Sequence, residues 1–180
     1  PKARLAVELL KTWKGEASAD DPAPTIFFAT WRAAIRHALR DELTEDAIRF
    51  FLAQRYSTST SDHWFELPTH PVWDDTATPQ IESRGQVVRS ALEAAVLGLW
   101  TELGEDVASW TCGRVHWHQP THAFGNNALL DGTVNLQRHP VGGELDSVWK
   151  SHFDVSNERA PFKVVAGPVY RMVADIADLK

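Results

Sequence analysis

The sequence predicts an α+β fold in which about the first 110 residues are mainly helical and are followed by short strands. Two observations support this prediction. Apolar residues recur at helical spacing in four stretches of the first part of the chain. From Trp110 onward they occur in short extended pieces separated by Gly and Pro. We therefore interpret the 180 residues as a single domain with a helical region (1–110) and a loop and strand region (111–180).

The first two helices are expected within residues 1–43. The first is marked by Leu5, Leu9 and Leu10. The second can be capped by Asp20 or Asp21, because Pro22 and Pro24 fit only the first turn of a helix. The apolar stripe of this second helix consists of Ile26 or Phe27, Thr30, Trp31, Ala34, Ile35, Ala38 and Leu39.

A third helix is expected after Thr44, a cap residue followed by two acidic residues that suit the positive end of a helix dipole. Its apolar face is formed by Ala47, Ile48, Phe51 and Leu52. Residues 57–82 are rich in Ser, Thr, Asp and Pro but carry Trp64, Phe65 and Trp73. We favour an ordered segment with a short helix near residues 62–67, and an aromatic docking loop is the alternative.

The strongest helical pattern follows in residues 83–106. Ser83 is a plausible cap, and Gly104 is a natural stop. Between them the apolar positions are Val88, Ala91, Leu92, Ala95, Val96, Leu99 and Leu103. Strands are then expected at residues 113–118, 147–153, 161–167 and 169–178. Gly142-Gly143 is interpreted as a turn that needs positive φ rather than as a phosphate-binding loop, since the residues that such a loop requires are missing.

Composition and charge exclude several classes of protein. The net charge is −6, and the 18 Lys and Arg residues are scattered, so no basic face for nucleic acid is expected. No apolar run approaches the roughly 20 residues of a membrane span, and no signal peptide is visible. The chain opens on Pro1 rather than Met and closes on an expected strand. We expect both ends to be cut from a longer polypeptide.

One stretch, residues 110–127, concentrates potential metal ligands: Cys112, His116, His118 and His122. A His-x-His pair in a strand places both rings on one face, as a metal site can require. A structural zinc site, however, usually has paired ligands at both ends, and here only one cysteine is present. We favour histidines that form hydrogen bonds in a semi-buried loop, and we assign no metal. Cys112 is interpreted as a small buried residue rather than a nucleophile.

Four stretches carry a family resemblance, and each matches a short pattern. LLKTWKGEASADDPAPTIFFATW resembles L-x-x-W-[DN]-G followed by a helix with Phe and Trp. ALEAAVLGLWTELGEDVASWTCGRVHWHQPTHAFG resembles a helix ending in W-x-x-L-G and then W-x-W-G-R-L-H. HPVGGELDSVW is similar to P-x-G-G-D-x-x-T-V, and AGPVYRMVADIAD to G-P-S-[YF]-R-x-[IV]-x-D. Together they resemble the C-terminal half of the β chain of penicillin-acylase (penicillin amidase) enzymes, which are N-terminal nucleophile hydrolases.

The sequence departs from these patterns at a few positions. They are Lys14, Cys112, Glu144, Val169 and the Ala123-Phe124 pair that follows His122. The resemblance still extends over almost the whole chain. It implies that the chain is part of a larger αββα sandwich, in which residues 110–124 connect a helical region to strands of the central sheet.

The resemblance also implies where the chemistry of the family resides. The reactive Ser, Cys or Thr is the first residue of the mature β chain, its own α-amino group is the base, and an Asn in a W-N-N segment helps to form the oxyanion hole. Pro1 has neither a hydroxyl nor a thiol, and the Asn126-Asn127 pair stands in another context. We therefore assign no catalytic residue to this chain and leave its substrate-binding residues open.

The resemblance thus predicts a fragment of an amidohydrolase that cleaves an acyl amide bond, in a β-lactam side chain, an acyl-homoserine lactone or a similar compound. It predicts no cofactor here, because the Ca²⁺ site of the family would lie upstream of Pro1. The expected partners are the α chain and the N-terminal part of the β chain, or else further copies of this chain. The expected location is the periplasm or outside the cell. The alternative is a free-standing His-rich module that binds metal or another protein.

Overall fold

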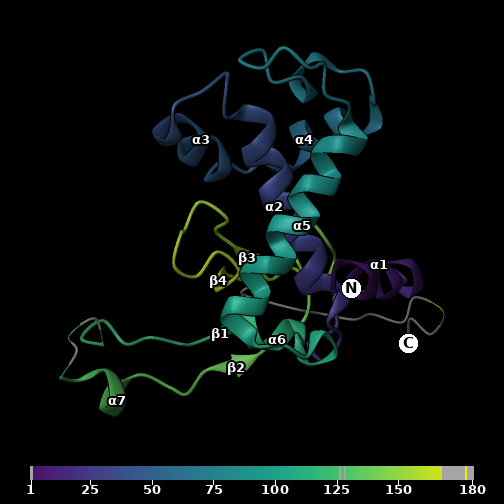
Figure 1. Ribbon diagram of the computed structural model, residues 1–180. Helices are drawn as coiled ribbons and strands as arrows, with labels where there is room; N and C mark the ends of the chain where they lie inside the picture. Colours follow the sequence, from purple (N-terminus) through teal and green to yellow (C-terminus); the bar gives the residue numbers. More distant parts are fainter. Residues whose placement is uncertain (1, 126, 128, 168–176, 178–180) are drawn as a thin grey trace.

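The computed structural model describes residues 2–125, 127, 129–167 and 177, and it confirms an α+β chain (Figure 1). Its elements in order are α1 (Lys2–Thr12), α2 (Ala23–Leu39), α3 (Glu45–Leu52), α4 (Tyr56–Glu66), the 3₁₀ helix η1 (Pro71–Trp73), α5 (Arg84–Leu103), the 3₁₀ helix η2 (Val107–Ser109), α6 (Cys112–Val115), β1 (Trp117–His118), α7 (Asp131–Val134), β2 (His139–Pro140), β3 (His152–Phe153) and β4 (Val164–Ala166).

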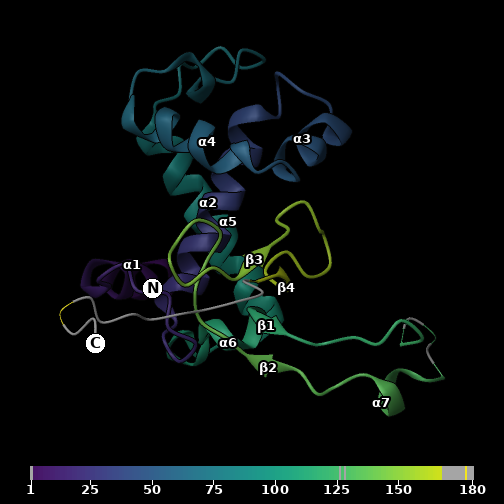
Figure 2. The ribbon, with the colours of Figure 1, turned by 180° about the vertical axis from the view of Figure 1, so that it is seen from behind.

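The long helices α2 and α5 lie side by side and form the axis of the molecule, with α3 and α4 at one end and α6 at the other (Figures 1 and 2). The apolar stripe expected in α2 is buried at Ile26, Ala34, Ile35, Ala38 and Leu39. In α5 the buried residues are Val87, Ala91, Ala95, Val96 and Leu99. The expected faces are therefore confirmed, except that Phe28 is buried rather than Phe27, and Val87 more deeply than Val88.

The predicted start of α3 and both predicted ends of α5 are confirmed, whereas the N-cap residue of α2 is Pro22 and not Asp20 or Asp21. Ser83 and Gln86 form a reciprocal capping box at the start of α5, and Gly104 ends this helix with φ of 96°. The Thr44 side chain accepts a hydrogen bond from the backbone N–H of Ala47. At the start of α2, Oδ1 of Asp21 accepts the backbone N–H of Ala23 at 2.8 Å. Local side-chain chemistry therefore fixes where these helices begin and end.

Residues 57–82 are ordered, as favoured. The helix expected near residues 62–67 exists but is longer, because α4 begins at Tyr56. Trp73 is almost fully buried, and its indole N–H donates to the carbonyl of Leu67 at 3.1 Å. The indole N–H of Trp31 in α2 donates to Oγ of Ser61 in α4 at 3.1 Å. The aromatic residues therefore anchor this segment to the helical body.

Within the part of the chain that the structure describes, the strands form two small antiparallel sheets. In the first, Trp117 of β1 lies opposite Pro140 of β2; in the second, Phe153 of β3 lies opposite Val164 of β4. The strands expected at 147–153 and 161–167 are confirmed only at β3 and β4, and most of the strand expected at 169–178 lies outside the described residues. Positive φ is confirmed at Gly143, where it is 92°.

The strand predicted at residues 113–118 is wrong over its first half, since Cys112–Val115 is the short helix α6. The reason is a long-range contact. The backbone N–H groups of Cys112 and Gly113 donate to the carbonyls of Asp21 and Ala19, at 2.9 and 2.7 Å. A Cβ at Gly113 would lie 2.4 Å from the Cβ of Pro140, so glycine allows this close approach.

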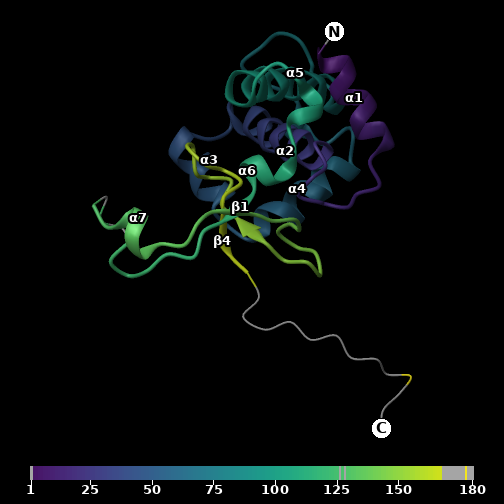
Figure 3. The ribbon, with the colours of Figure 1, turned by 90° about the horizontal axis from the view of Figure 1, so that it is seen from below.

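The core consists of two adjoining clusters. The larger packs α2, α3 and α5 against Phe153, Val155 and Phe162 of the strand region. The smaller surrounds Trp110 and Ile26, which are fully buried. The described residues between β1 and β2, which are 119–125, 127 and 129–138, leave this body as a long arm that carries α7 (Figure 3). Among the helices of the described ranges, none combines the length and apolar character of a membrane span.

Candidate functional site

In residues 110–127, the stretch with the potential metal ligands, the first two of these side chains lie inside the core. His116 is fully buried; its Nδ1 is 2.8 Å from the carbonyl oxygen of Phe162, and its ring packs edge-on against Phe153. Burial lowers the pKa of His116, although its hydrogen bond with the carbonyl of Phe162 acts in the opposite direction. His116 is therefore neutral at physiological pH and ties the strand region to α6.

Cys112, four residues earlier, is also buried. Burial, and secondarily the charge of Asp21, raise the pKa of its thiol to about 12. A thiol with such a pKa is almost entirely protonated at neutral pH and is a poor nucleophile and a poor metal ligand. The interpretation of Cys112 as a buried core residue is confirmed.

The other two potential ligands, to which no metal is assigned, lie elsewhere. His118 is exposed on β1 opposite His139 of β2. His122 lies in the arm, where its Nδ1 accepts the backbone N–H of Phe124 at 3.2 Å. The structure therefore does not bring Cys112, His116, His118 and His122 together. Within the described residues no group of three or more His, Cys, Asp or Glu side chains is placed to hold a metal ion.

The most distinctive concave surface is an apolar hollow of about 480 Å³ between α1, α2, α4 and α5, which we call the α2–α4 hollow. Its walls are formed by Leu10, Phe27, Thr30, Trp31, Ala34, Asp62, Phe65, Arg84 and Val88. Phe27 is 42 % exposed although its neighbour Phe28 is buried. Apolar concave surfaces of this kind bind apolar side chains or ligands. Sequence analysis missed the hollow, because four separate helices build it.

Three carboxylates, Asp62, Glu144 and Asp146, border a smaller hollow of about 200 Å³ that shares Phe27 and Trp31 with the first. Within the described residues none of the three forms an ion pair with Lys or Arg. Partial burial, followed by repulsion from Asp146, raises the pKa of both Asp62 and Glu144. The smaller hollow is therefore acidic, whereas the lining of the α2–α4 hollow contains one acidic and one basic side chain, Asp62 and Arg84.

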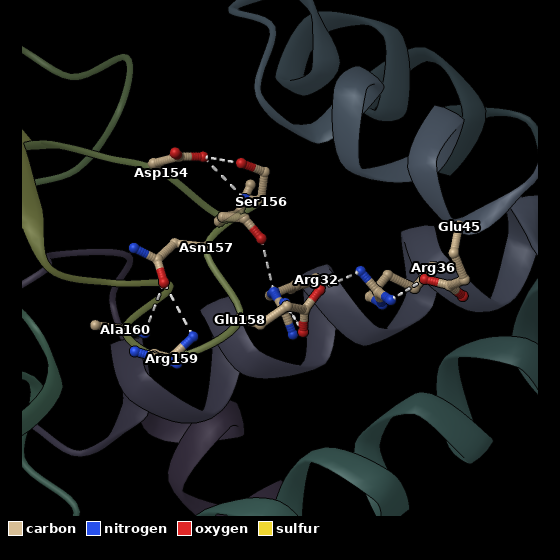
Figure 4. A network of polar contacts seen from close by, with 10 residues as sticks. Arg32, Arg36, Glu45, Asp154, Ser156, Asn157, Glu158, Arg159 and Ala160 are labelled. Carbon is tan, nitrogen blue, oxygen red and sulfur yellow. Dashed lines mark hydrogen bonds and ion pairs between the residues drawn. The ribbon is translucent and has the colours of Figure 1, made fainter.

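Two arginines of α2 bind the loop of residues 154–160 (Figure 4). Nε of Arg32 donates to the carbonyl of Val155 at 2.8 Å, and its Nη2 is 3.0 Å from Oε2 of Glu158. Arg36 contacts the other oxygen of Glu158 at 3.0 Å and also pairs with Glu45 of α3. Burial tends to raise the pKa of Glu158, but Arg32 and Arg36 outweigh it, and the pKa is lowered. The spacing of Arg32 and Arg36 on one helix face is the only sequence signal for this network.

The loop itself is held by its own side chains (Figure 4). Oδ1 of Asp154 accepts the backbone N–H of Ser156 at 2.9 Å, and Oδ1 of Asn157 accepts the N–H groups of Arg159 and Ala160 at 2.9 and 3.1 Å. Its ordered shape brings Glu158 to the arginines. The network joins the two regions of the chain.

Residues 1–180 match the family model described as penicillin amidase. The chain belongs to the penicillin amidase family. Sequence analysis had already pointed to this family, and the assignment is confirmed.

Curated proteins similar to this chain are named acyl-homoserine lactone acylase QuiP. The protein of Pseudomonas syringae pv. syringae (strain B728a) is 26 % identical over 184 residues, which cover 98 % of this chain and 22 % of that protein. The protein of Pseudomonas aeruginosa (strain ATCC 15692 and its synonyms, including PAO1) is 29 % identical over 176 residues, 85 % of this chain and 21 % of that protein. The chain thus spans about a fifth of the length of these relatives.

The residues that resemble penicillin amidases have structural roles in this chain. The indole N–H of Trp13 donates to the carbonyl of Glu16 at 2.7 Å, next to Gly15, whose φ is 84°. Trp110 is buried, and its indole N–H donates to the carbonyl of Gly104 at 2.9 Å. These motif residues shape turns at the ends of helices.

Proposed function

We propose that this chain is part of an acyl-amide hydrolase of the penicillin amidase family and that it supplies scaffold rather than the nucleophile. The observation that carries the proposal is the family match over residues 1–180, together with relatives named as acyl-homoserine lactone acylases. The buried thiol of Cys112, with its raised pKa, supports a structural role for the tract that contains it.

In this proposal the reactive residue, the oxyanion hole and any Ca²⁺ site belong to parts of the protein outside residues 1–180. The short strands would extend the central sheet of an αββα sandwich, and the α2–α4 hollow would face other parts of the protein. The remainder of the same precursor is the proposed partner, with self-association of this chain as the second possibility. A periplasmic or secreted location is part of the same proposal.

The substrate class is tested with the full-length protein that contains this chain. We expect it to cleave the amide of an N-acyl-homoserine lactone, so that mass spectrometry detects the free fatty acid and homoserine lactone. The side-chain amide of a penicillin is the second substrate to test. Opening of the lactone ring with the amide intact, or no cleavage of either amide, would contradict the proposal.

The scaffold role is tested by Cys112→Ala in the same protein. We expect kcat/KM to stay within about twofold of the original value, because an inert buried thiol makes no contact in the transition state. Circular dichroism serves as the control for folding. A folded variant that has lost about a hundredfold or more in kcat/KM would show that this chain contributes a reactive group.

A further inference from the structure

We propose that the arm, residues 119–125, 127 and 129–138, is a docking element that packs against the part of the same protein lying outside residues 1–180. The proposal rests on the proposed function, since it assumes that this chain works within a larger family member. The arm leaves the helical body between β1 and β2 and extends well away from it in all three views (Figures 1–3).

The arm exposes large apolar side chains that the body does not cover. Leu129 is 89 % exposed, Phe124 69 % and Leu136 61 %. Single exposed apolar residues are ordinary on protein surfaces, but several on one projecting element are typical of an interaction site. Helix α7 adds to this element without burying any residue of its own.

The low content of charged residues in the arm also supports a docking role. Asp131 and Arg138 are the only Asp, Glu, Lys or Arg residues in 119–138, although 23 % of the whole chain is charged. Both already have contacts within the chain: Oδ1 of Asp131 accepts Nδ2 of Asn135 at 2.7 Å, and the guanidinium of Arg138 lies 4.0 Å from the centre of the Trp117 ring. Depletion of charge is the compositional mark of the buried centre of an interface.

The arm has a defined shape of its own. Oδ1 of Asn135 accepts the backbone N–H of His122 at 2.8 Å, and its Nδ2 donates to the carbonyl of Gly125 at 3.0 Å. The N–H of Leu136 donates to the carbonyl of Pro120 at 3.1 Å. A Cβ at Gly125 would lie 1.8 Å from Oδ1 of Asn135, so glycine is needed for this fit. Such preorganisation lowers the entropic cost of binding.

The length of the relatives indicates what the arm packs against. This chain covers only 21–22 % of the acylases that it matches, so most of such a protein lies outside residues 1–180. A surface within the same protein is present at a high effective concentration, and it does not need charge to steer the encounter. A nearly uncharged, apolar and preorganised arm fits that situation better than it fits an acidic or basic partner.

The test places the photoreactive amino acid p-benzoylphenylalanine at position 129 of the full-length protein, in place of Leu129. After irradiation we expect cross-links to peptides from outside residues 1–180, identified by mass spectrometry. In a mixture of ¹⁵N-labelled and unlabelled protein, the two peptides of each cross-link should both be labelled or both be unlabelled. The matched control is the same amino acid in place of Asp46 of α3, whose side chain is 92 % exposed, and we expect at most about a fifth of the yield there.

Cross-links between a labelled and an unlabelled peptide would overturn the proposal and show that the arm contacts a second copy of the protein. Cross-links confined to residues 1–180, or a yield no higher than that of the control, would overturn it. In a second variant, Asn135→Ala combined with the probe at 129 should lower the yield at least threefold; an unchanged yield would count against the preorganised arm. Because the readout needs no turnover, failure of the proposed activity is distinguished from failure of the docking.

Discussion

At the scale of single residues, His116 holds the strand region to the helical region. Its ring is fully buried, contacts Phe153, and makes a hydrogen bond with the carbonyl of Phe162, 46 positions along the chain. Removing such a group leaves both a cavity and a buried carbonyl without its partner. A histidine near a cysteine thus serves here to join two parts of a core.

We predict that His116→Ala lowers the free energy of unfolding by about 3 kcal/mol, the usual cost of removing a large buried ring. Urea unfolding of the protein that contains this chain measures the effect. The matched control is His118→Ala, two residues away and exposed, which should change it by less than about 0.5 kcal/mol. Equal losses in the two variants would show that His116 does not join the regions.

Residue-scale prediction from sequence succeeded where the signal was local. The caps at Thr44 and Ser83 and the stop at Gly104 each depend on neighbours within four positions, and all are confirmed. The hydrogen-bonding role expected for the histidines of residues 110–127 is confirmed at His116 and His122. The specific partner of His116 was beyond prediction, because it comes from another part of the chain.

At the scale of elements, α5 shows how a helix is defined at both ends. The Ser83 side chain accepts the backbone N–H of Gln86, and the Gln86 side chain accepts the N–H of Ser83 at 2.9 Å. At the other end the N–H of Gly104 donates to the carbonyl of Trp100 at 2.9 Å. Because α5 packs along α2, the residues at which α5 begins and ends determine where Arg84 and Val88 lie in the lining of the α2–α4 hollow.

We predict that Ser83→Ala destabilises the protein by about 1 kcal/mol, since one half of the capping box is lost. Thermal unfolding is the measurement. Ser90→Ala, in the exposed middle of the same helix, is the control and should be neutral or slightly stabilising, because Ala has the higher helix propensity. If Ser90→Ala proved as harmful as Ser83→Ala, the cap would not be the cause.

Element prediction failed where distant segments decide the conformation. A strand is expected at residues 113–118, yet the carbonyls of Asp21 and Ala19 accept the N–H groups of Cys112 and Gly113, and the helical turn Cys112–Val115 results. The α2–α4 hollow and the pairing of Arg32 with Glu158 were missed for the same reason. Each depends on residues that are brought together only by the packing of several helices.

At the scale of the whole molecule, three histidines in different places couple stability to pH in the same direction. Burial is the largest cause that lowers the pKa of His37, His116 and His152, and nearby cations add to it for His37 and His152. In the unfolded chain each would return to about 6.5. Between the lowered pKa and this value the unfolded state binds more protons than the folded state.

We therefore predict that the free energy of unfolding falls as the pH is lowered from about 7.5 to about 5.5. Replacing His152 by Gln should reduce this fall, since one of the three groups is removed. Asp62 and Glu144, whose pKa values are raised, act in the opposite direction, from the pH of their raised pKa values downward. Urea titrations at both pH values measure the effect, and a stability that is flat or rises towards acid would refute the prediction.

The ion pairs of α2 also bear on how the protein is made. Arg32 finds its partners 123 and 126 positions later in the chain, at Val155 and Glu158. At a ribosome that adds about 5–20 residues per second, this helix leaves the exit tunnel about 6–25 s before those partners leave it. During that interval α5 can cover one side of α2, while the side that later contacts Val155 and Glu158 remains exposed to solvent. Cotranslational chaperones are therefore expected to meet this face of the nascent chain first.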